Sequence, residues 1–275
     1  MYEEPYRWIE AVGNRRQYLD DQFKQGSPIV ALSYDTGILI LTVSRGTPKV
    51  YEIYDRIALG GMGHPADLEK LRFQLLDMAH LEGFNRSPSD VTGARLLKNG
   101  LAPTVKQAFE EIFKAPFITK ILLAELGETL ERNQFLTIDY DGTFEETKTC
   151  AVVAGTLSIQ AQLSEEISSR IETTELSLEE AIDLAARVWA KGSLLHTAIL
   201  SDVTSNGKTT EAQEGDSRKT DFDAEEVVAH LRQTLVHSTL ECRLLDRTIS
   251  GSSKYRVLSN DEVSTLLPTP MPSAQ

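Results

Sequence analysis

The sequence predicts an α+β fold in which two antiparallel sheets are stacked between layers of helices. Segments with strand-like patterning occur in groups, at 29–63 and again at 117–155, rather than alternating singly with helices. Each group is followed by two helical segments, which can cover the outer face of a sheet. The chain has 275 residues and 41% hydrophobic content, which suffices for the core of such an arrangement.

The first expected element is an amphipathic helix over residues 4–23 that ends before Gly26-Ser27-Pro28. Its apolar side chains recur at near-helical spacing: Trp8, Val12, Leu19 and Phe23. Two β runs follow at 29–34 and 38–43, and the Asp35-Thr36-Gly37 segment between them is typical of a tight hairpin. The second run is nearly all apolar, as expected of a strand that is covered on both faces.

A second strand pair is expected over 49–63, followed by a long helix. At Gly60-Gly61-Met62-Gly63 the hydrophobic pattern changes from the two-residue period of a strand to the 3.6-residue period of a helix. We interpret the glycines as allowing close packing at this strand-to-helix corner. Pro65 suits the first turn of the helix. The buried stripe of this helix is expected to comprise Leu68, Leu71, Leu75, Met78 and Leu81.

A further helix is expected from about Asp90, and Gly100 and Pro103 should bend or interrupt it. One face of this helix carries Val105, Phe109 and Ile112. Strand-like patterning then returns in three runs: 117–126, 135–140 and 149–155. These runs supply the second group of strands.

Two more helices follow those strands. The stripe of the first comprises Leu163, Ile167 and Ile171. The second opens at Ser177, with Glu180 three residues later in a capping box. Its buried side chains are Ala181, Leu184 and Val188. A short helix at 224–235 and strand-like runs at 239–246 and 254–258 come later in the chain.

The composition divides the chain into five segments. Between the second pair of helices and the last strands, Ser, Thr, Gly and charged residues replace the apolar ones, which is typical of an exposed linker or insertion. The expected segments are an N-terminal segment with its helix at 1–25, a sandwich core at 26–204, the linker at 205–223, a C-terminal helix and strands that complete the core at 224–267, and a disordered tail at 268–275.

The charge balance excludes several kinds of partner. The 28 Lys and Arg residues against 41 Asp and Glu give a formal charge of −13, which disfavours binding to nucleic acid or to an anionic membrane surface. The sequence contains neither a run of about 18 apolar residues nor a secretory signal. The two cysteines, Cys150 and Cys242, fit a reducing compartment with free thiols. We therefore expect a cytoplasmic protein.

Common catalytic and cofactor motifs do not occur in the sequence. The Gly60–Gly63 segment lacks the Gly-Lys-Ser/Thr ending of a phosphate-binding loop. The five histidines form no close-ligand pattern for a metal, and the sequence has no Gly-x-Ser-x-Gly elbow. We expect neither a cofactor nor a metal site.

Several short motifs follow one another in a specific order: SPIVALSYDTGILIL, PKVYEIYDRIALGGMGHPADLEKLR, DVTG at 90–93, FLTIDYDG, CAVVAGT, SLEEA, LECRLLD and YRVLSNDEVSTLL. Their order and spacing resemble those of α-type subunits of bacterial, actinobacterial-like 20S proteasomes. The resemblance extends over almost the whole chain apart from 205–221. It implies a four-layer αββα sandwich of the N-terminal-nucleophile hydrolase type.

The resemblance also bears on whether the chain is catalytic. In the β-type subunits of the family, a threonine becomes the N-terminus and its own amine assists as a base. Ser27 falls at the position of that nucleophile and Lys49 at that of the lysine, but the aspartate position falls in TVSRG, which has no carboxylate. We interpret the helix at 4–23 as a structured part of the mature chain and not as a propeptide that is removed. The nitrogen of residue 27 then remains a peptide amide. We therefore expect a non-catalytic subunit.

Two alternatives remain open. The first is an active, self-processing threonine/serine-type peptidase that uses Ser27 as its nucleophile. The second is an interaction module that has kept the sandwich but does not assemble into a barrel.

The resemblance implies partners for the α-type reading. Seven copies would form a homo-heptameric α ring on a ring of proteolytic β-type subunits. Lys49 and Gly26 would line the pocket that receives the C-terminus of a ring-shaped activator, whether an ATPase or an ATP-independent one. The implied pore gate consists of Met1, Tyr2, Glu3, Glu4, Pro5, Tyr6 and Arg7. The Tyr54-Asp55-Arg56 triplet, which many α subunits carry at the gate, is expected in a core strand here.

Overall fold

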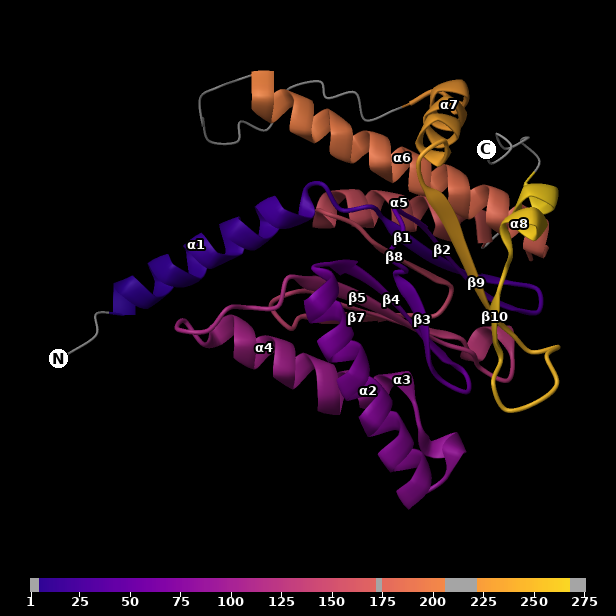
Figure 1. Cartoon of the computed structure of the whole chain (residues 1–275), viewed down its shortest axis with the longest axis horizontal. Helices are drawn as coiled ribbons and strands as arrows, with labels where there is room; N and C mark the ends of the chain where they lie inside the picture. The colour runs from indigo at the N-terminus through magenta and orange to yellow at the C-terminus, as the bar shows by residue number, and fades with distance from the viewer. Residues whose placement is uncertain (1–4, 172–174, 206–221, 268–275) are drawn as a thin grey trace.

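The computed structural model describes residues 5–171, 175–205 and 222–267. Two five-stranded antiparallel sheets are stacked with helices on both outer faces, as Figure 1 shows. The strand order is β10-β9-β2-β1-β8 in the first sheet and β3-β4-β5-β6-β7 in the second. The expectation of an α+β sandwich of the αββα type is therefore confirmed.

The strands of each sheet come from distant parts of the chain. The first sheet contains β1 (Ile29–Tyr34), β2 (Gly37–Ser44), β8 (Cys150–Val153), β9 (Thr239–Asp246) and β10 (Tyr255–Val257). The second contains β3 (Val50–Tyr54), β4 (Ile57–Gly63), β5 (Thr119–Glu125), β6 (Gln134–Ile138) and β7 (Phe144–Thr147). The late strand β9 pairs with β2 over its full length, so the C-terminal segment completes the first sheet.

The helices form the two outer layers (Figure 1). The first sheet is covered by α5 (Leu157–Ile171), α6 (Leu178–Ser205), α7 (Ala224–Leu235) and α8 (Asn260–Leu266). The second is covered by α2 (Pro65–Asn85), α3 (Gly93–Arg95) and α4 (Ala102–Glu110). The remaining helix, α1 (Pro5–Phe23), begins outside the sandwich and ends between the two sheets, where its last apolar side chains join the inter-sheet core.

Side-chain alternation along the strands explains why three hydrophobic cores form. Ile29 and Ala31 of β1 point into the core between the sheets, whereas Val30 and Leu32 point toward α5 and α6. The same alternation holds on β2, β4 and β5. These four strands are thus covered on both faces, which agrees with their nearly continuous apolar runs in the sequence.

The glycines before α2 act as the sequence predicts. Gly63 has a φ of 131°, and a Cβ atom there would lie 1.9 Å from the carbonyl oxygen of Ile118. A Cβ on Gly61 would lie 2.1 Å from a methyl group of Leu68. These positions bring β4 close to α2 and to the strand beside it, which confirms the close-packing interpretation.

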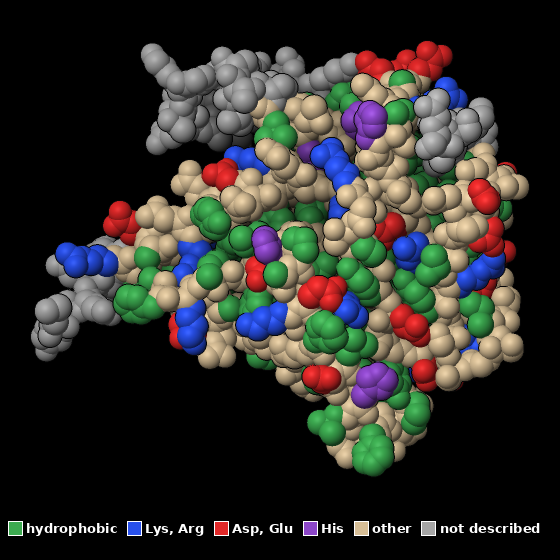
Figure 2. Space-filling model, in the orientation of Figure 1, with side chains coloured by type: hydrophobic (Ala, Val, Ile, Leu, Met, Phe, Trp, Pro, Cys, Tyr) green, Lys and Arg blue, Asp and Glu red, His purple; other side chains and the backbone are tan. Residues whose placement is uncertain are grey.

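Three side chains on the predicted apolar stripes or faces of helices are exposed. Trp8 is 50% exposed because the first half of α1 extends away from the sheets (Figure 1). Leu81 is 63% exposed near the end of α2, where Figure 2 shows hydrophobic side chains gathered at the lower tip of the molecule. Ile112 is 39% exposed because α4 already ends at Glu110. Helices α1 and α2 thus extend beyond the surface that they cover, whereas α4 ends before Ile112.

Other boundaries also differ from the predictions. The helix expected from Asp90 is divided, with a π-helical turn at Leu96–Leu101 between α3 and α4, which confirms the interruption around Gly100. Strand β7 and helix α8 were not predicted. The Tyr54-Asp55-Arg56 triplet does not lie within a strand, because Tyr54 ends β3 and the next two residues form the turn to β4.

Some predictions concern residues outside the described ranges. They include Met1, Tyr2, Glu3 and Glu4 of the expected gate, most of the linker at 205–223 and the tail at 268–275. Across the ranges that are described, every helix is too short or too polar to cross a lipid bilayer.

Candidate functional site

A cavity of about 380 Å³ opens beside the end of α1, where β3 and β4 meet the start of α2. Gly26, Ser27 and Lys49 all line it. Its apolar walls are formed by Phe23, Met62, Pro65, Leu68 and Ile118. Gly26 and Lys49, which the sequence resemblance assigned to one pocket, therefore line one cavity.

Lys49 directs its side chain toward the first sheet. Its Nζ donates a hydrogen bond to the carbonyl oxygen of Val43 over 3.0 Å. Burial lowers the pKa of the Lys49 ammonium from its usual value, and the nearby Glu241 carboxylate opposes that change. The hydrogen-bond acceptor at Val43 is uncharged, so it does not neutralise the ammonium.

Gly26 lies against the opposite side of the cavity. Its N–H donates to the Phe23 carbonyl over 2.8 Å, which ends α1 in a tight turn. A Cβ atom at this position would lie 2.4 Å from Met62 Sδ. The absence of a side chain on Gly26 therefore lets the chain pass close to β4, and it leaves backbone groups at the cavity wall.

His196 fixes the backbone at Gly26 from the other side. Its Nε2 accepts a hydrogen bond from the Gly155 N–H over 3.0 Å, so the proton is on Nδ1, which lies 2.8 Å from the Gly26 carbonyl oxygen. Burial lowers the pKa of His196 and favours this neutral form. The imidazole thus joins α6 to the segment after α1 and to the end of β8.

Ser27 is held in the chain by contacts that do not activate its hydroxyl. Its Oγ donates to the Val43 carbonyl over 2.9 Å and accepts from Trp189 Nε1 over 3.1 Å. Neither partner is a base that could take the hydroxyl proton. The nitrogen of Ser27 is the amide that joins it to Gly26, so it is not an amine base either.

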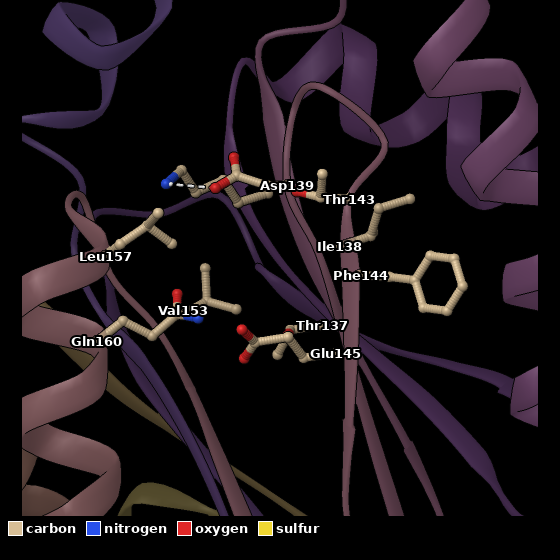
Figure 3. A pocket seen from close by; sticks show the side chains of 10 residues that line it. Thr137, Ile138, Asp139, Thr143, Phe144, Glu145, Val153, Leu157 and Gln160 are labelled. Carbon is tan, nitrogen blue, oxygen red and sulfur yellow. Dashed lines mark ion pairs between the residues drawn. The ribbon is translucent and has the colours of Figure 1, made fainter.

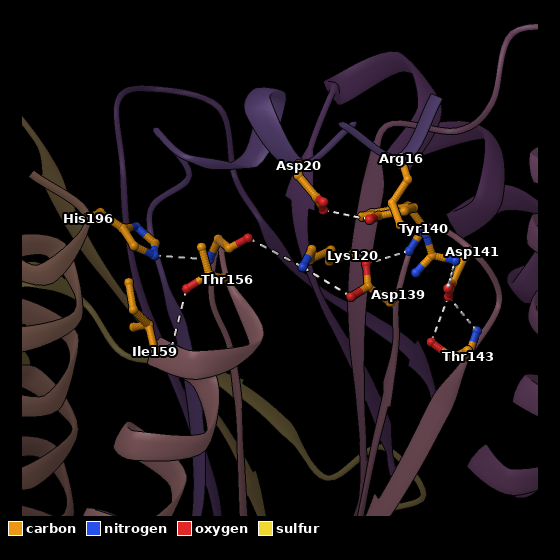
Figure 4. A network of polar contacts seen from close by, with 11 residues as sticks. Arg16, Asp20, Lys120, Asp139, Tyr140, Asp141, Thr143, Thr156, Ile159 and His196 are labelled. Atoms are coloured by element: carbon orange, nitrogen blue, oxygen red, sulfur yellow. Dashed lines mark hydrogen bonds and ion pairs between the residues drawn. The ribbon is translucent and has the colours of Figure 1, made fainter. Parts of the chain in front are cut away.

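The helix before this site is attached to the sandwich by polar contacts of Asp20 and Arg16, which Figure 4 shows, and of Arg15. The hydroxyl of Tyr140 donates to Asp20 over 2.5 Å, and Arg16 lies 3.2 Å from Asp141. The guanidinium of Arg15 donates to carbonyl oxygens at and beyond the end of α4, over 2.8 to 3.1 Å: Ala108, Phe109, Glu111, Ile112 and Lys114. These contacts make α1 an integral part of the fold.

A smaller cavity of about 160 Å³ lies between β6, β7, β8 and the start of α5 (Figure 3). Lys120 reaches it, but its ammonium is 3.1 Å from Asp139 and also lies 5.2 Å from the centre of the Phe23 ring. Because an internal carboxylate already neutralises Lys120, this cavity is a weaker candidate for binding an anion than the one beside Lys49.

Sequence reasoning missed one charged residue at the Lys49 site. The expected aspartate position in TVSRG has no carboxylate, but Glu241 on β9 lies opposite Thr42 on β2 and brings one from elsewhere in the chain. Its Oε2 accepts the backbone N–H of Lys49 over 3.1 Å. The sequence signal was limited to an acidic residue in the interior of the predicted strand at 239–246, which also contains Arg243 and ends at Asp246.

The structure places the remaining predicted gate residues at the start of α1. Pro5, Tyr6 and Arg7 form the first turn of that helix. This turn lies at the end of α1 that is far from the sheets (Figure 1).

Comparisons with known proteins agree with this architecture. The proteasome subunit family matches residues 23–208. The proteasome subunit alpha of Actinosynnema mirum is 32% identical over 197 residues, which cover 71% of this chain and 70% of the relative. The proteins of the same name from Xylanimonas cellulosilytica and Streptomyces scabiei are 33% and 30% identical over 177 and 187 residues. These alignments cover 62% and 66% of this chain, and 69% and 72% of the relatives.

The family match covers more than half of the chain, and it includes the end of α1, both sheets up to β8, and the helices α2 to α6. The two-sheet sandwich is the arrangement that the sequence resemblance implied. The chain therefore belongs to the proteasome subunit family, and within it to the alpha type.

Proposed function

We propose that this chain is a non-catalytic α-type subunit of a 20S proteasome core particle. In this proposal, seven copies form an outer ring that stacks on a ring of proteolytic β-type subunits, controls substrate entry and docks an activator for intracellular protein degradation. The names of the relatives support the α type. The amide at Ser27 and the contacts of its hydroxyl support a subunit without its own peptidase activity.

The cavity beside Lys49 is the proposed docking site for the C-terminus of an activator. The observation that carries this proposal is that Lys49 and Gly26 line one cavity with apolar walls, while the Lys49 ammonium is bonded to an uncharged carbonyl. An ammonium in such a place can form a charge-assisted hydrogen bond with a C-terminal carboxylate. Apolar side chains of the tail would pack against the walls.

A Lys49→Ala variant tests the docking site in particles co-expressed with the β-type subunit. Assembly should be unchanged, while activator docking should weaken by about 1.5–3 kcal/mol per tail. Several tails bind one ring, so avidity should amplify the loss in activator-stimulated degradation of an unfolded protein. The exposed Lys148, on the segment after β7, provides a matched Lys148→Ala control. Unchanged stimulation in Lys49→Ala would reject the site.

One observation favours a second candidate function. Ser27 Oγ and Lys49 Nζ approach the same carbonyl oxygen, as a nucleophile and a neighbouring lysine would in a self-processing peptidase. That activity requires cleavage between Gly26 and Ser27 to release the amine. Intact mass measurement of the purified particle decides between the two: an uncleaved Gly26–Ser27 bond supports the α role, and a chain that starts at Ser27 supports the peptidase.

Native mass of the same preparation tests assembly. A particle with several copies of this chain and of the β subunit is expected. A single chain, with or without the β subunit present, would instead favour an interaction module that has kept only the sandwich.

A further inference from the structure

We propose that Glu241 is the positioning residue for Lys49 in the cavity beside α1. The proposal rests on the proposed function of that cavity as the docking site for a C-terminal carboxylate. Glu241 lies on β9, near the C-terminal end of the chain, and its side chain reaches the start of β3 in the other sheet. It is only 3% exposed, so its carboxylate acts inside the protein.

Glu241 and Val43 hold the two ends of Lys49. The carboxylate accepts the backbone N–H of Lys49 over 3.1 Å, and the Val43 carbonyl accepts from its Nζ over 3.0 Å. Val43 lies on β2 and Glu241 on the adjacent strand β9, where Leu240, the residue before Glu241, pairs with Val43. A lysine that is fixed at both ends before docking loses less conformational entropy when a ligand arrives.

The charges around Lys49 come from several elements. Glu241 faces it from β9 and favours its charged form, whereas Arg45, on the loop after β2, disfavours it. Arg243 on β9 lies 3.7 Å from Glu241 Oε2. Tyr51, His64 and Glu69 line the same cavity, and Glu69 is paired with Arg72 over 2.6 Å.

Glu241 forms an ion pair with Arg243, and its negative charge also acts on Lys49. Its Oε1 is buried and accepts no hydrogen bond from the described residues. Arg243 is too far from Oε2 for a hydrogen bond. The negative charge of Glu241 therefore favours the protonated Lys49 ammonium, which burial alone would disfavour.

Replacing Glu241 by Gln separates the charge from the hydrogen bond. The amide oxygen of Gln can still accept the Lys49 N–H, so the backbone contact is kept. Without the negative charge, the Lys49 ammonium should lose its proton at a lower pH. At a pH low enough to keep the lysine charged in both proteins, binding of a carboxylate should be unchanged or stronger because a like charge has been removed. At alkaline pH the variant should bind more weakly.

The experiment uses the full chain in particles co-expressed with the β-type subunit. The probe is a fluorescein-labelled octapeptide that ends in Leu-Phe-Ala with a free carboxylate, and its C-terminal amide is the control ligand. Fluorescence polarisation gives the dissociation constant between pH 6 and pH 10. The variants are Glu241→Gln, Glu241→Asp, Lys49→Ala and, as a charge control on the exposed surface of α5, Glu165→Gln.

For Glu241→Gln we expect carboxylate binding to be lost at a lower pH, with binding at pH 9 weaker by roughly threefold to tenfold than in the wild type. Glu241→Asp keeps the charge, so the pH at which carboxylate binding is half lost (the pH midpoint) should be that of the wild type. Its shorter side chain can weaken binding equally at every pH without moving this midpoint. Glu165→Gln and the amide peptide should show no such shift.

The possible failures are distinguishable. If Lys49→Ala weakens carboxylate binding but Glu241→Gln has the wild-type midpoint, the positioning role is wrong and the docking site stands. If Lys49→Ala binds both peptides as the wild type does, the docking site itself is wrong, and the role of Glu241 falls with it. If Glu241→Gln does not assemble, a midpoint in Glu241→Asp that moves to lower pH overturns the proposal.

Discussion

Ser27 and Lys49 donate hydrogen bonds to one oxygen, the carbonyl of Val43, over 2.9 and 3.0 Å. In an N-terminal-nucleophile enzyme, the hydroxyl proton must pass to an amine base. Here the hydroxyl and the ammonium are both donors to a shared acceptor, and the Ser27 nitrogen is an amide. The same two side chains that would be needed for catalysis thus contact the end of β2 and line the wall of a cavity.

A Ser27→Ala variant should therefore lose stability but no peptidase activity. Trp189 Nε1 would lose its acceptor in a largely buried environment, which costs about 1–3 kcal/mol of the free energy of unfolding. Hydrolysis of a fluorogenic peptide by the α/β particle should equal that of the wild type. Thermal unfolding measures the first effect, and Ser27→Thr, which keeps a hydroxyl, should recover part of it. Loss of hydrolysis in Ser27→Ala at unchanged assembly would instead favour the peptidase reading.

The attachment of α1 leads to a second prediction, which compares two adjacent arginines. Arg15 donates to five carbonyl oxygens around the end of α4, whereas Arg16 forms an exposed ion pair with Asp141. Arg15→Ala should lower the free energy of unfolding by about 1.5–3 kcal/mol, because hydrogen bonds from a charged donor are lost. Arg16→Ala should cost less than about 1 kcal/mol.

Arg15→Lys provides a further control for this comparison. Lysine keeps the charge but not the planar fork that reaches several carbonyls, so it should recover only part of the stability. Denaturant unfolding of the three variants, together with limited proteolysis of the segment before Ser27, measures the effect. Equal losses for Arg15→Ala and Arg16→Ala would contradict the role of Arg15 as the main polar contact between α1 and α4.

The expected gate leads to a third prediction. Deleting residues 1–7 removes the first turn of α1 and the four residues before it, but leaves Arg15 and the buried end of the helix in place. If these residues restrict the pore, the particle should hydrolyse an unfolded protein faster without any activator. Glu10→Ala, on the exposed surface of the same helix, is the control. An unchanged basal rate in the deletion variant would count against a gate formed by this segment.

Local patterning in the sequence was sufficient to predict most of the sandwich. The strands predicted at 29–34 and 38–43 and the capping box at Ser177 and Glu180 all occur where they were expected. Periodicity does not indicate where a neighbouring sheet ends, so it could not show that Trp8 and Leu81, at the ends of their apolar stripes, would be exposed. Strand β7 was missed because its four residues, FEET, are all exposed at the edge of a sheet.

The candidate site was less predictable than the fold. Family resemblance alone brought Gly26 and Lys49 together, since nothing in their local sequence indicates a shared cavity. Glu241 contacts a residue 192 positions earlier in the chain, through a strand pairing that hydrophobic patterning cannot specify. Helix α8, in contrast, was predictable, because Ser259 and Glu262 form a capping box that is visible in the sequence.

His196 makes a prediction about pH. The folded protein holds the imidazole neutral, because Nε2 accepts from Gly155 and burial lowers its pKa, whereas the unfolded chain binds a proton near pH 6.5. As the pH falls below that value, the unfolded state binds more protons than the folded state, so stability is lost. The wild type should therefore lose free energy of unfolding between pH 7.5 and pH 5.5, by up to about 1.4 kcal/mol for each pH unit from this residue.

His196→Asn separates this effect from other titrating groups. The variant should be less stable at pH 7.5 by about 1–3 kcal/mol, because the Gly26 and Gly155 contacts are weakened. Its stability should nevertheless depend less steeply on pH, since the proton-binding difference at residue 196 is gone. His230, whose pKa burial also lowers, is present in both proteins and cancels in the comparison. Equal slopes in denaturant unfolding at pH 5.5, 6.5 and 7.5 would show that His196 is charged in the fold, and that the Gly155 contact does not hold it neutral.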